Sequence, residues 1–561
     1  MTAAPDAPTV NVAAATFPTL SEEEMKLLRP LASERRFADG QVIFKAGDAD
    51  IDLFVVQSGQ IDILNPTDDN RLIATHGPRA FAGDIDLLTR RPVIVTAVAH
   101  GETVLLAVPG SMMRTLLIRV PKLGEKMLNA FTLRRQALTE TGIVGLRLVG
   151  PGRCRETNMV REFLHKNFVP FTWYDPEQPN GREVFEELGS PRVQPVVDCG
   201  GGKVLSNPSL VDLAAEVGVW RQCPDQTVDL AVIGAGPAGM TAAVYAASEG
   251  MSTIVVDRFG PGGQAGGSSK IENFIGFPAG LSGTELATRG VLQMLKFGAK
   301  MVAPVVVEKI EPAREPGQYH LLHLDCRSTI RAKVVLVATG VNWRRLDADG
   351  VARFESTGVH HACTSVESAL YDRCHVAVVG AGNSAGQAAM YMAECCPDRT
   401  VHMIIRNKLG PGMSDYLAQR IRAAPNVTLH EGREVAGVTG DGGRIARARL
   451  KTRDGDSAEE LDVNAVFVFI GADPQASCLP DAAARDDHGY VLTGVDALRS
   501  GRWPLDTRDP LPLETTIPGV LAAGDLRAGS TKRVGFAVGD GSMAVTSAHR
   551  LATAFAQHAH A

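Results

Sequence analysis

The sequence predicts a multidomain protein in which a β-barrel or jelly-roll unit is followed by several α/β units. Its 561 residues are too many for one hydrophobic core, since domains usually hold about 100 to 200 residues. From Phe37 to Ile63, short β-rich runs alternate with Asp-Gly, Ala-Gly-Asp and Ser-Gly turns, a pattern typical of small all-β folds. Two later segments, beginning at Val228 and Val376, each join an apolar strand, a glycine turn and a helix, which indicates nucleotide-binding α/β folds.

Composition and charge place the protein among ordinary globular proteins. The chain is 45% hydrophobic and 21% charged, with a formal net charge of −6, so neither a nucleic-acid nor an anionic-membrane partner is predicted. Residues 1–19 lack a basic start and a continuous apolar run and are expected to be a flexible tail, which favours a cytoplasmic location. The nine cysteines are scattered without any Cys-x-x-Cys, and no metal site is predicted.

Residues 20–138 resemble the cyclic-nucleotide-binding domain family, with helical patterns at 21–31 and 109–136 on either side of the β-rich runs. That family holds the cyclic phosphate with a Gly-Glu pair at a helix start and an Arg just after a Pro. Gly83 and Asp84 occupy the Gly-Glu positions here.

The phosphate-pairing Arg of that family is replaced by Val93. Losing a charge-assisted partner costs a phosphodiester about 1.5 to 3 kcal/mol. Two alternatives remain open. Arg90 or Arg91 substitutes and a cyclic-nucleotide-like effector binds, or the domain has a structural or altered-ligand role.

Residues 143–222 show a βαβ order followed by a hairpin and a last helix, and this segment resembles a glutaredoxin-like thioredoxin fold. Pro195 matches that family's cis-proline. The redox position at the first helix start holds one cysteine, Cys154. Because a helix N-terminus lowers a thiol's pKa, Cys154 is a candidate monothiol nucleophile. The alternative is a redox-inactive docking domain.

The strand that begins at Val228 turns at three glycines into a helix. Gly234 allows the turn, Gly236 lets backbone N–H groups approach a pyrophosphate, and Gly239 lets the helix pack close to its strand. The next apolar run ends in Asp257, a carboxylate expected to hold an adenosine ribose 2′-OH. The candidate cofactor residues here are Gly234, Gly236, Pro237, Ala238, Gly239 and Asp257.

The second strand–glycine–helix segment repeats this pattern, so the chain holds two Rossmann units. Its next strand ends in Arg406, where an NAD-specific enzyme would place a carboxylate. An Arg there can pair with a 2′-phosphate, which favours NADPH over NADH; a surface Arg without a ligand is the alternative. The candidate residues are Gly380, Gly382, Asn383, Ser384 and Arg406.

Further segments, including Gly-Gly-Gln, Glu-Asn-Phe and Ala-Ala-Gly-Asp, resemble the thioredoxin reductase family. The resemblance implies FAD and NADPH as cofactors. It implies an FAD-binding domain over 226–342 and 467–561, with an NADPH-binding domain over 343–466 inserted. The residues implied to meet FAD in these segments are Gly263, Gln264, Asn273, Gly340, Gly524, Asp525, Arg533 and Val534.

The resemblance breaks at the dithiol. Thioredoxin reductases read Cys-Ala-Thr-Cys-Asp, whereas this chain has Ala362, Ser365 and Val366 at the two cysteine positions and the acid position. Cys363 is one place off register. We therefore expect no internal dithiol relay, and Cys363 and Cys154 are the candidate catalytic thiols.

The sequence is compatible with two functions. The first is an NADPH-oxidising flavoprotein of the thioredoxin-disulfide reductase type that reduces a thioredoxin-like protein, a quinone or an electron-transfer protein. The second is a flavin-based redox sensor with incidental turnover. A homodimer is expected in either case.

Overall fold

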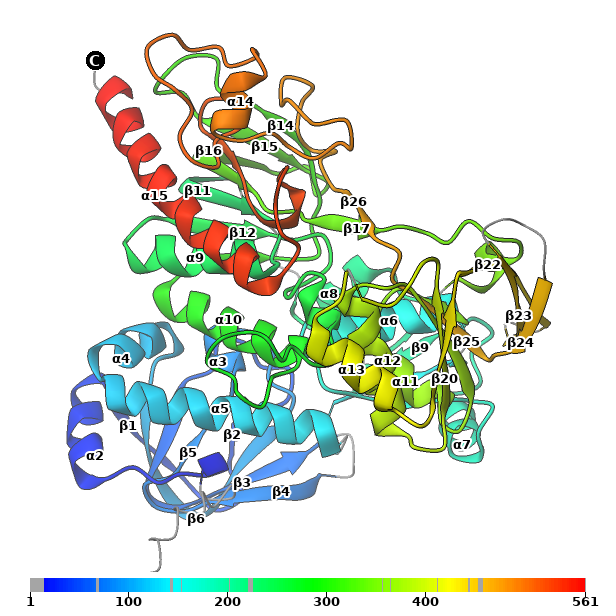
Figure 1. Ribbon diagram of the computed structural model, residues 1–561. Helices are drawn as coiled ribbons and strands as arrows, with labels where there is room; N and C mark the ends of the chain where they lie inside the picture. Colours follow the sequence, from blue (N-terminus) through cyan, green and yellow to red (C-terminus); the bar gives the residue numbers. More distant parts are fainter. Residues whose placement is uncertain are drawn as a thin grey trace, which may run out of the picture.

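Figure 1 shows the computed structural model of the chain. It describes residues 15–66, 70–141, 145–152, 154–200, 202–219, 225–355, 357–363, 365–410, 412–441, 444–452 and 458–559. Most of the predicted tail, residues 1–14, lies outside this part of the chain.

The N-terminal unit is an antiparallel β-structure with the strand order β1-β6-β3-β4, in which β2 pairs with β6 and β5 with β3. Its strands are β1 (Ser33–Phe37), β2 (Val42–Phe44), β3 (Leu53–Asn65), β4 (Arg71–His76), β5 (Phe81–Ala82) and β6 (Thr96–Val108). Its helices are α2 (Glu22–Leu28), α3 (Asp86–Thr89), α4 (Met113–Arg119) and α5 (Pro121–Thr141). The single helical pattern predicted at 109–136 is two helices, because Pro121 cannot continue α4 but suits the first position of α5.

The second unit contains a four-stranded sheet of order β10-β9-β7-β8. Strands β7 and β8 are parallel, and the β9–β10 hairpin is antiparallel to β7, as the βαβ-plus-hairpin pattern predicts. The Gln194–Pro195 bond is cis. The elements are β7 (Leu146–Val149), α6 (Arg155–Lys166), β8 (Phe171–Tyr174), α7 (Pro179–Glu187), β9 (Val196–Asp198), β10 (Val204–Ser206) and α8 (Leu210–Glu216).

The third unit has a sheet of order β13-β12-β11-β16-β15-β14, with β27 also beside β16. Its strands are β11 (Gln226–Ile233), β12 (Thr253–Val256), β13 (Lys300–Val302), β14 (Val307–Glu311), β15 (His320–Leu324), β16 (Thr329–Val337) and β27 (Val520–Ala522). Helices α9 (Pro237–Ser248), α10 (Gly283–Phe297) and α15 (Val534–Ala559) pack on one face through a shared apolar core. A second core covers the opposite face of the sheet.

The fourth unit has a parallel sheet of order β18-β25-β19-β20-β21 and a separate antiparallel sheet, β22-β23-β24. Its strands are β18 (Val359–His360), β19 (His375–Val379), β20 (Thr400–Ile405), β21 (Val427–Glu431), β22 (Arg433–Asp441), β23 (Arg444–Thr452), β24 (Ala458–Asp462) and β25 (Ala465–Val468). Its helices are α11 (Ser365–Ser368), α12 (Asn383–Cys395) and α13 (Asp415–Ala423).

The predicted return to the FAD domain at residue 467 is wrong. Phe467 lies in β25, which pairs with β18 and β19 inside the fourth unit. The chain crosses back only at β26 (Ala472–Pro474), which pairs antiparallel with the outgoing segment β17 (Val341–Trp343). The two crossings thus form one ribbon between the nucleotide-binding units.

The second unit lies between the other three. Its His165 Nε2 is 3.0 Å from Thr284 Oγ1 in the third unit, and Asn167 Nδ2 donates to the Phe259 carbonyl oxygen at 3.0 Å. Arg91 of the barrel donates to the Asn167 carbonyl oxygen at 2.5 Å. None of the helices in the described ranges is both long and apolar enough to span a membrane.

Candidate functional site

A cleft of about 1770 Å³ opens where the carboxyl ends of the parallel strands of the third and fourth units face each other and α6. Every predicted cofactor residue except Gly239 lines it. Those residues are Gly234, Gly236, Pro237, Ala238, Asp257, Gly263, Gln264, Asn273, Gly340, Gly380, Gly382, Asn383, Ser384, Arg406, Gly524, Asp525, Arg533 and Val534. The motifs that are far apart in the sequence therefore share one cleft.

The first glycine turn has the geometry that its spacing predicts. Gly234 has φ +106°, and a Cβ there would lie 2.4 Å from the Ala338 carbonyl oxygen. A Cβ on Gly239 would lie 1.9 Å from the Gly234 carbonyl oxygen, so this glycine serves helix packing and not the cleft surface. A Cβ on Gly236 would meet only Gly263 Cα, at 3.9 Å. The start of α9 therefore leaves open space for an anion.

Asp257 has a structural role that the sequence does not reveal. Its carboxylate accepts backbone N–H groups from Ala235, Phe259 and Gly260, each at 2.8 Å. An ionised carboxylate has roughly four lone-pair sites. Asp257 thus shapes the turn and keeps about one acceptor site for a ribose hydroxyl.

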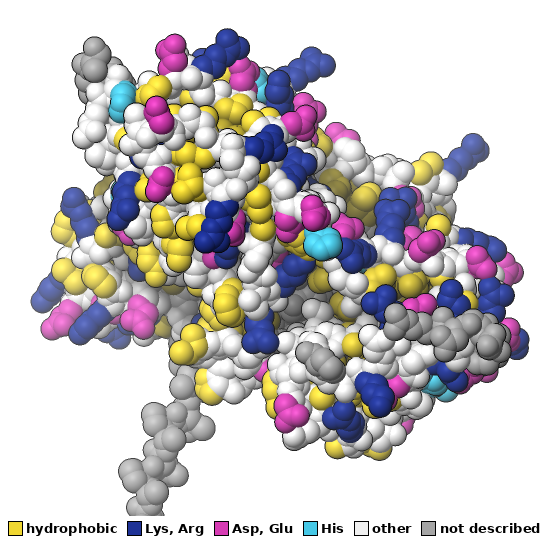
Figure 2. Space-filling view, turned by 45° about the horizontal axis from the view of Figure 1, so that its top comes forward, with side chains coloured by type: hydrophobic (Ala, Val, Ile, Leu, Met, Phe, Trp, Pro, Cys, Tyr) yellow, Lys and Arg dark blue, Asp and Glu magenta, His cyan; other side chains and the backbone are white. Residues whose placement is uncertain are grey.

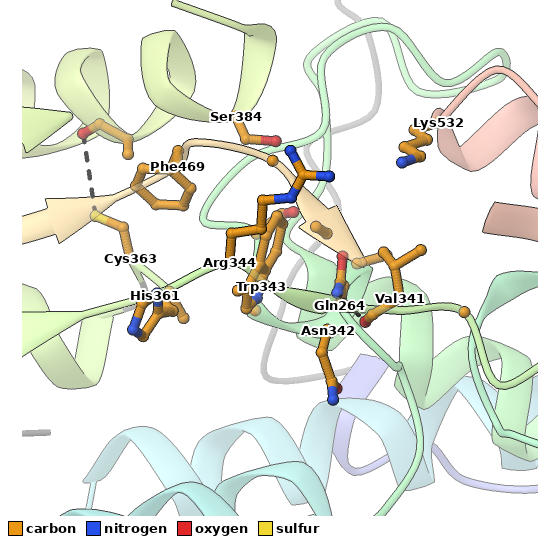
Figure 3. Close-up of a pocket in the computed structure, with 18 of the residues that line it drawn as sticks. Gln264, Val341, Asn342, Trp343, Arg344, His361, Cys363, Ser384, Phe469 and Lys532 are labelled. Atoms are coloured by element: carbon orange, nitrogen blue, oxygen red, sulfur yellow. Dashed lines mark hydrogen bonds between the residues drawn. The ribbon is translucent and has the colours of Figure 1, made fainter. Parts of the chain in front are cut away.

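Two polar side chains occupy the junction between the third unit and the crossing ribbon. The Gln264 amide donates to the Val341 carbonyl oxygen, so Gln264 is fixed against β17 (Figure 3). Asp525 lies in the cleft wall, and burial raises its pKa to about 6, although Lys532 opposes the shift. Asp525 is therefore a partly buried acid in the wall of a ligand-sized space.

The second nucleotide position presents a cation. Arg406 follows β20, its side chain is 70% exposed, and its Nε lies 4.0 Å from Glu434 Oε1. Arg433 and Lys451 line the same part of the cleft from β22 and β23. The sequence analysis missed these two residues because the antiparallel sheet that carries them has no nucleotide motif.

The position of the missing dithiol lies against the predicted FAD segment. Ser268 and Cys363 form a β-bridge, and a Cβ on Gly267 would lie 3.5 Å from Ala362 Cβ. Ala362, which the resemblance aligns with the family's first thiol, therefore lies beside the Gly263–Ser268 loop.

The structure argues against a nucleophilic role for Cys363. Its side chain is 3% exposed, and Sγ points to the Ala388 carbonyl oxygen at 4.0 Å (Figure 3). Burial raises the pKa of this thiol well above its usual value. A thiolate, the form that attacks disulfides, is therefore disfavoured.

Cys154 does not line the cleft. It is the N-cap residue of α6, and its thiol donates to Glu156 Oε2 at 3.2 Å. Eight cysteines lie in the described ranges, and all eight are free. Among these eight cysteines, neither candidate thiol belongs to a dithiol pair.

A histidine–carboxylate pair lies next to the lost thiol position. His361 Nε2 is 3.2 Å from Glu355 Oε2, and this contact holds the pKa of Glu355 below its usual range. His361 Nδ1 is buried and has no hydrogen-bond partner among the described residues. Figure 3 shows His361 in the same part of the cleft as Trp343 and Phe469. The sequence offered no signal for the pair beyond a lone histidine beside Ala362.

Comparison with known proteins shows that the third and fourth units together match one enzyme family. Residues 228–550 match the pyridine nucleotide-disulphide oxidoreductase family, and residues 34–119 match the cyclic nucleotide-binding domain. A thioredoxin reductase of Listeria monocytogenes is 28% identical over 326 residues, which are 58% of this chain and 94% of that protein. An alkyl hydroperoxide reductase polypeptide of Pseudomonas putida is 31% identical over 324 residues, which are 58% of this chain and 58% of that protein.

A solved structure agrees with these relatives. The crystal structure of thioredoxin reductase from T. acidophilum superposes with a TM-score of 0.51 at 28% identity, covering 58% of this chain and 98% of the other. The predicted cofactors, FAD and NADPH, and the predicted oxidoreductase class are confirmed. The chain therefore belongs to the pyridine nucleotide-disulphide oxidoreductase family, as an NADPH-dependent flavoprotein oxidoreductase with an N-terminal cyclic nucleotide-binding domain.

Proposed function

We propose that this protein is a reductase of the thioredoxin-disulfide reductase type that delivers electrons to its acceptor without a dithiol. The observation that carries this proposal is that Ala362, and not a thiol, lies beside the Gly263–Ser268 loop, while Cys363 Sγ points into the fourth unit. A two-electron acceptor that enters the cleft needs no internal disulfide.

The described residues fit both cofactors. The open space at Gly236 suits a pyrophosphate, and Gln264 and Asp525 flank the region where the FAD ring system and ribityl chain would lie. Gly380, Gly382 and Arg406 would hold NADPH, with the Arg406 guanidinium on the 2′-phosphate. Bound FAD would supply two-electron redox chemistry between NADPH and the acceptor.

Reduction of a quinone or a disulfide needs a proton besides the hydride that NADPH gives up. NADPH, one proton and a quinone yield NADP⁺ and a quinol. We assign this proton to the imidazolium form of His361, in which Nε2–H donates to Glu355 and Nδ1–H, without a partner among the described residues, is the proton transferred. A histidine in this arrangement can act as a general acid.

We propose that the second unit is a thioredoxin-like docking domain and not a redox centre. Its helix α6 contributes Arg155, Met159 and Lys166 to the cleft wall, whereas Cys154 stays outside the cleft lining. The unit therefore forms one wall of the cleft, beside which an acceptor would dock.

A second candidate function, redox or ligand sensing, is favoured by one set of contacts. Arg135 of the barrel bonds Asp84 at 2.5 Å and Asp86 at 2.6 Å, and also donates to the Phe168 carbonyl oxygen at 3.3 Å. The adjacent Asn167 donates to Phe259, which lines the cleft. These contacts join the barrel to the cleft through the second unit, and they support regulation of turnover by the barrel.

We also propose a homodimer. Tyr245 on α9 and Phe536 and Met543 on α15 are exposed apolar side chains of the third unit, and yellow hydrophobic side chains gather over that part of the molecule in Figure 2. Sedimentation of the wild-type chain and of Phe536→Lys tests this assignment, which a monomeric wild type contradicts.

The enzymatic function is tested by anaerobic reduction with NADPH, followed by a screen of quinones, ferricyanide and thioredoxin disulfide. We expect bleaching of the flavin and rapid reoxidation by small acceptors, with slow reduction of thioredoxin. Efficient thioredoxin reduction in a Cys154→Ser, Cys363→Ser double variant would refute the assigned electron path, and flavin that NADPH cannot reduce would favour a sensor.

A further inference from the structure

The barrel contains a second cavity, of about 190 Å³ and open to solvent on one side, which the oxidoreductase function does not use. It lies between the barrel strands and α5. Most of its wall is apolar and consists of Phe44, Ile51, Ile63, Ile73, Val93 and Val95. A space with this lining excludes strongly hydrated ligands and accepts an apolar body.

One cation lies in the wall of this cavity. Arg134 on α5 is 7% exposed, and its Nε and Nη1 donate to the carbonyl oxygens of Thr16, Phe81 and Gly83 at 2.6 to 3.1 Å. Its Nη2 is buried and has no hydrogen-bond partner among the described residues. A buried guanidinium donor in this state costs free energy that an anion in the cavity would recover.

The two acids of the cavity wall near Arg134, Asp84 and Asp86, both accept hydrogen bonds from Arg135. Against the effect of burial, the charge of Asp84 also raises the pKa of Arg134. Burial lowers the pKa of His76 to about 3, so this histidine is neutral. Arg134 keeps its charge at neutral pH, since burial lowers its pKa only to about 10.

A cyclic nucleotide does not suit this cavity. Val93 is buried, and its backbone N–H and carbonyl oxygen already bond Asp48 and Gly47. The two substitutes considered from the sequence face elsewhere, because Arg90 lies 3.8 Å from Asp50 and Arg91 bonds Asn167. An engineered cavity of about 150 Å³ holds one benzene ring, so 190 Å³ leaves no room for a purine, a ribose and a phosphate together.

We propose that the barrel cavity binds a small apolar monocarboxylate, about one ring or a short branched chain in size, whose carboxylate pairs with Arg134 Nη2. The apolar wall takes the hydrocarbon part, and the guanidinium selects the anion. This site is separate from the nucleotide cleft and does not depend on the proposed electron path.

The test is isothermal titration calorimetry on the full-length, flavin-loaded protein. The probes are monocarboxylates from butyrate to phenylacetate, the neutral isostere phenylacetamide, and cyclic AMP. We expect phenylacetate to bind at least about tenfold more tightly than phenylacetamide, the scale of one charge-assisted hydrogen bond. Cyclic AMP should not compete.

Variants distinguish the contribution of the Arg134 charge to binding from the contribution of the apolar space. Arg134→Gln should reduce the acid-to-amide ratio to near one. The matched control is Arg35→Gln, which changes an exposed barrel arginine. Arg35 lies over an aromatic ring, 5.8 Å from the Phe54 centroid, and this variant should preserve the acid-to-amide ratio. Ile73→Trp should fill the cavity and abolish binding of both probes without touching Arg134.

Three results would overturn the proposal. They are no binding of any monocarboxylate, equal binding of acid and amide by the wild type, and displacement of the acid by cyclic AMP. If Arg134→Gln does not fold, Ile73→Trp and the wild-type acid-to-amide ratio decide the matter.

Discussion

The nucleotide cleft and the barrel cavity recognise charge in different ways. In the cleft, open backbone at Gly236 and Gly382 faces the ligand space, and sequence motifs mark both places. In the barrel, the family's charged position is the apolar Val93, and the cation is Arg134 from a helix outside that motif. A binding site that the backbone forms requires glycines at fixed spacing, so the sequence reveals it. A binding site that depends on one side chain can use a residue from another part of the chain, and no sequence pattern then reveals it.

The largest expected effect is a loss of flavin binding in the cleft that leaves the barrel cavity unaffected. Gly236→Val places a side chain in the open space at the start of α9 and should abolish flavin binding, while the barrel keeps its ligand affinity. Visible absorbance of the purified protein measures the flavin content. Gly77→Val is the matched control, since a Cβ there meets no atom within 4 Å. A fully flavinated Gly236→Val protein would contradict the FAD assignment.

The second expected effect concerns proton delivery within the cleft. His361→Asn should lower quinone reduction about 10²-fold, the lower end of general acid catalysis. Ferricyanide takes electrons without protons, so its reduction should not change. The control is His323→Asn, because His323 also lies near a carboxylate, 3.4 Å from Glu311 Oε2, but does not line the cleft. Equal losses with both acceptors would show that His361 is structural.

The third effect concerns the selection of NADPH over NADH by the side chain of Arg406. Arg406→Ala should weaken NADPH binding by about 1.5 to 3 kcal/mol and leave NADH nearly unchanged, because only NADPH carries the 2′-phosphate. Steady-state kinetics with both nucleotides measures the difference. An equal loss for both would mean that Arg406 acts on the fold, or that Arg433 and Lys451 hold the phosphate.

The fourth effect concerns Asp525, a partly buried acid in the cleft wall. The pKa of Asp525 is raised by burial to about 6 from 3.8, so the folded state binds this proton more tightly than the unfolded state does. The stability that this proton contributes is present below about pH 4 and is lost as the pH rises through 6. Asp525→Asn should therefore stabilise the flavin-free protein by about 1 to 3 kcal/mol at pH 7 and have little effect at pH 4. Chemical denaturation at both pH values checks this, and a constant difference would contradict the assigned ionisation.

Sequence reasoning succeeded where the backbone sets the requirement. The positive φ of Gly234 and the contact at Gly239 follow from a local pattern, and so does the loss of the phosphate-pairing residue at Val93. It placed Phe467 in the wrong unit because a buried parallel strand has the same apolar run in either sheet.

Residues brought together by tertiary packing could not be foreseen. Arg134 is positioned by carbonyl groups 51 to 118 residues away in the chain. His361 becomes notable only when the contact with Glu355 is known, together with the lack of a hydrogen-bond partner for its buried Nδ1 among the described residues. Neither residue has a spacing that distinguishes it from an ordinary core residue.

The smallest expected effect concerns the off-register cysteine. Cys363→Ser should retain most NADPH-dependent quinone reduction, because Sγ points away from the FAD loop and burial keeps it a thiol. Reduced enzyme should also lack a long-wavelength thiolate–flavin charge-transfer band. Cys396→Ser is a suitable control, since Cys396 is another free cysteine of the same unit. Loss of disulfide reduction in Cys363→Ser alone, with quinone reduction intact, would mean that this segment rearranges during turnover and that Cys363 is the catalytic thiol.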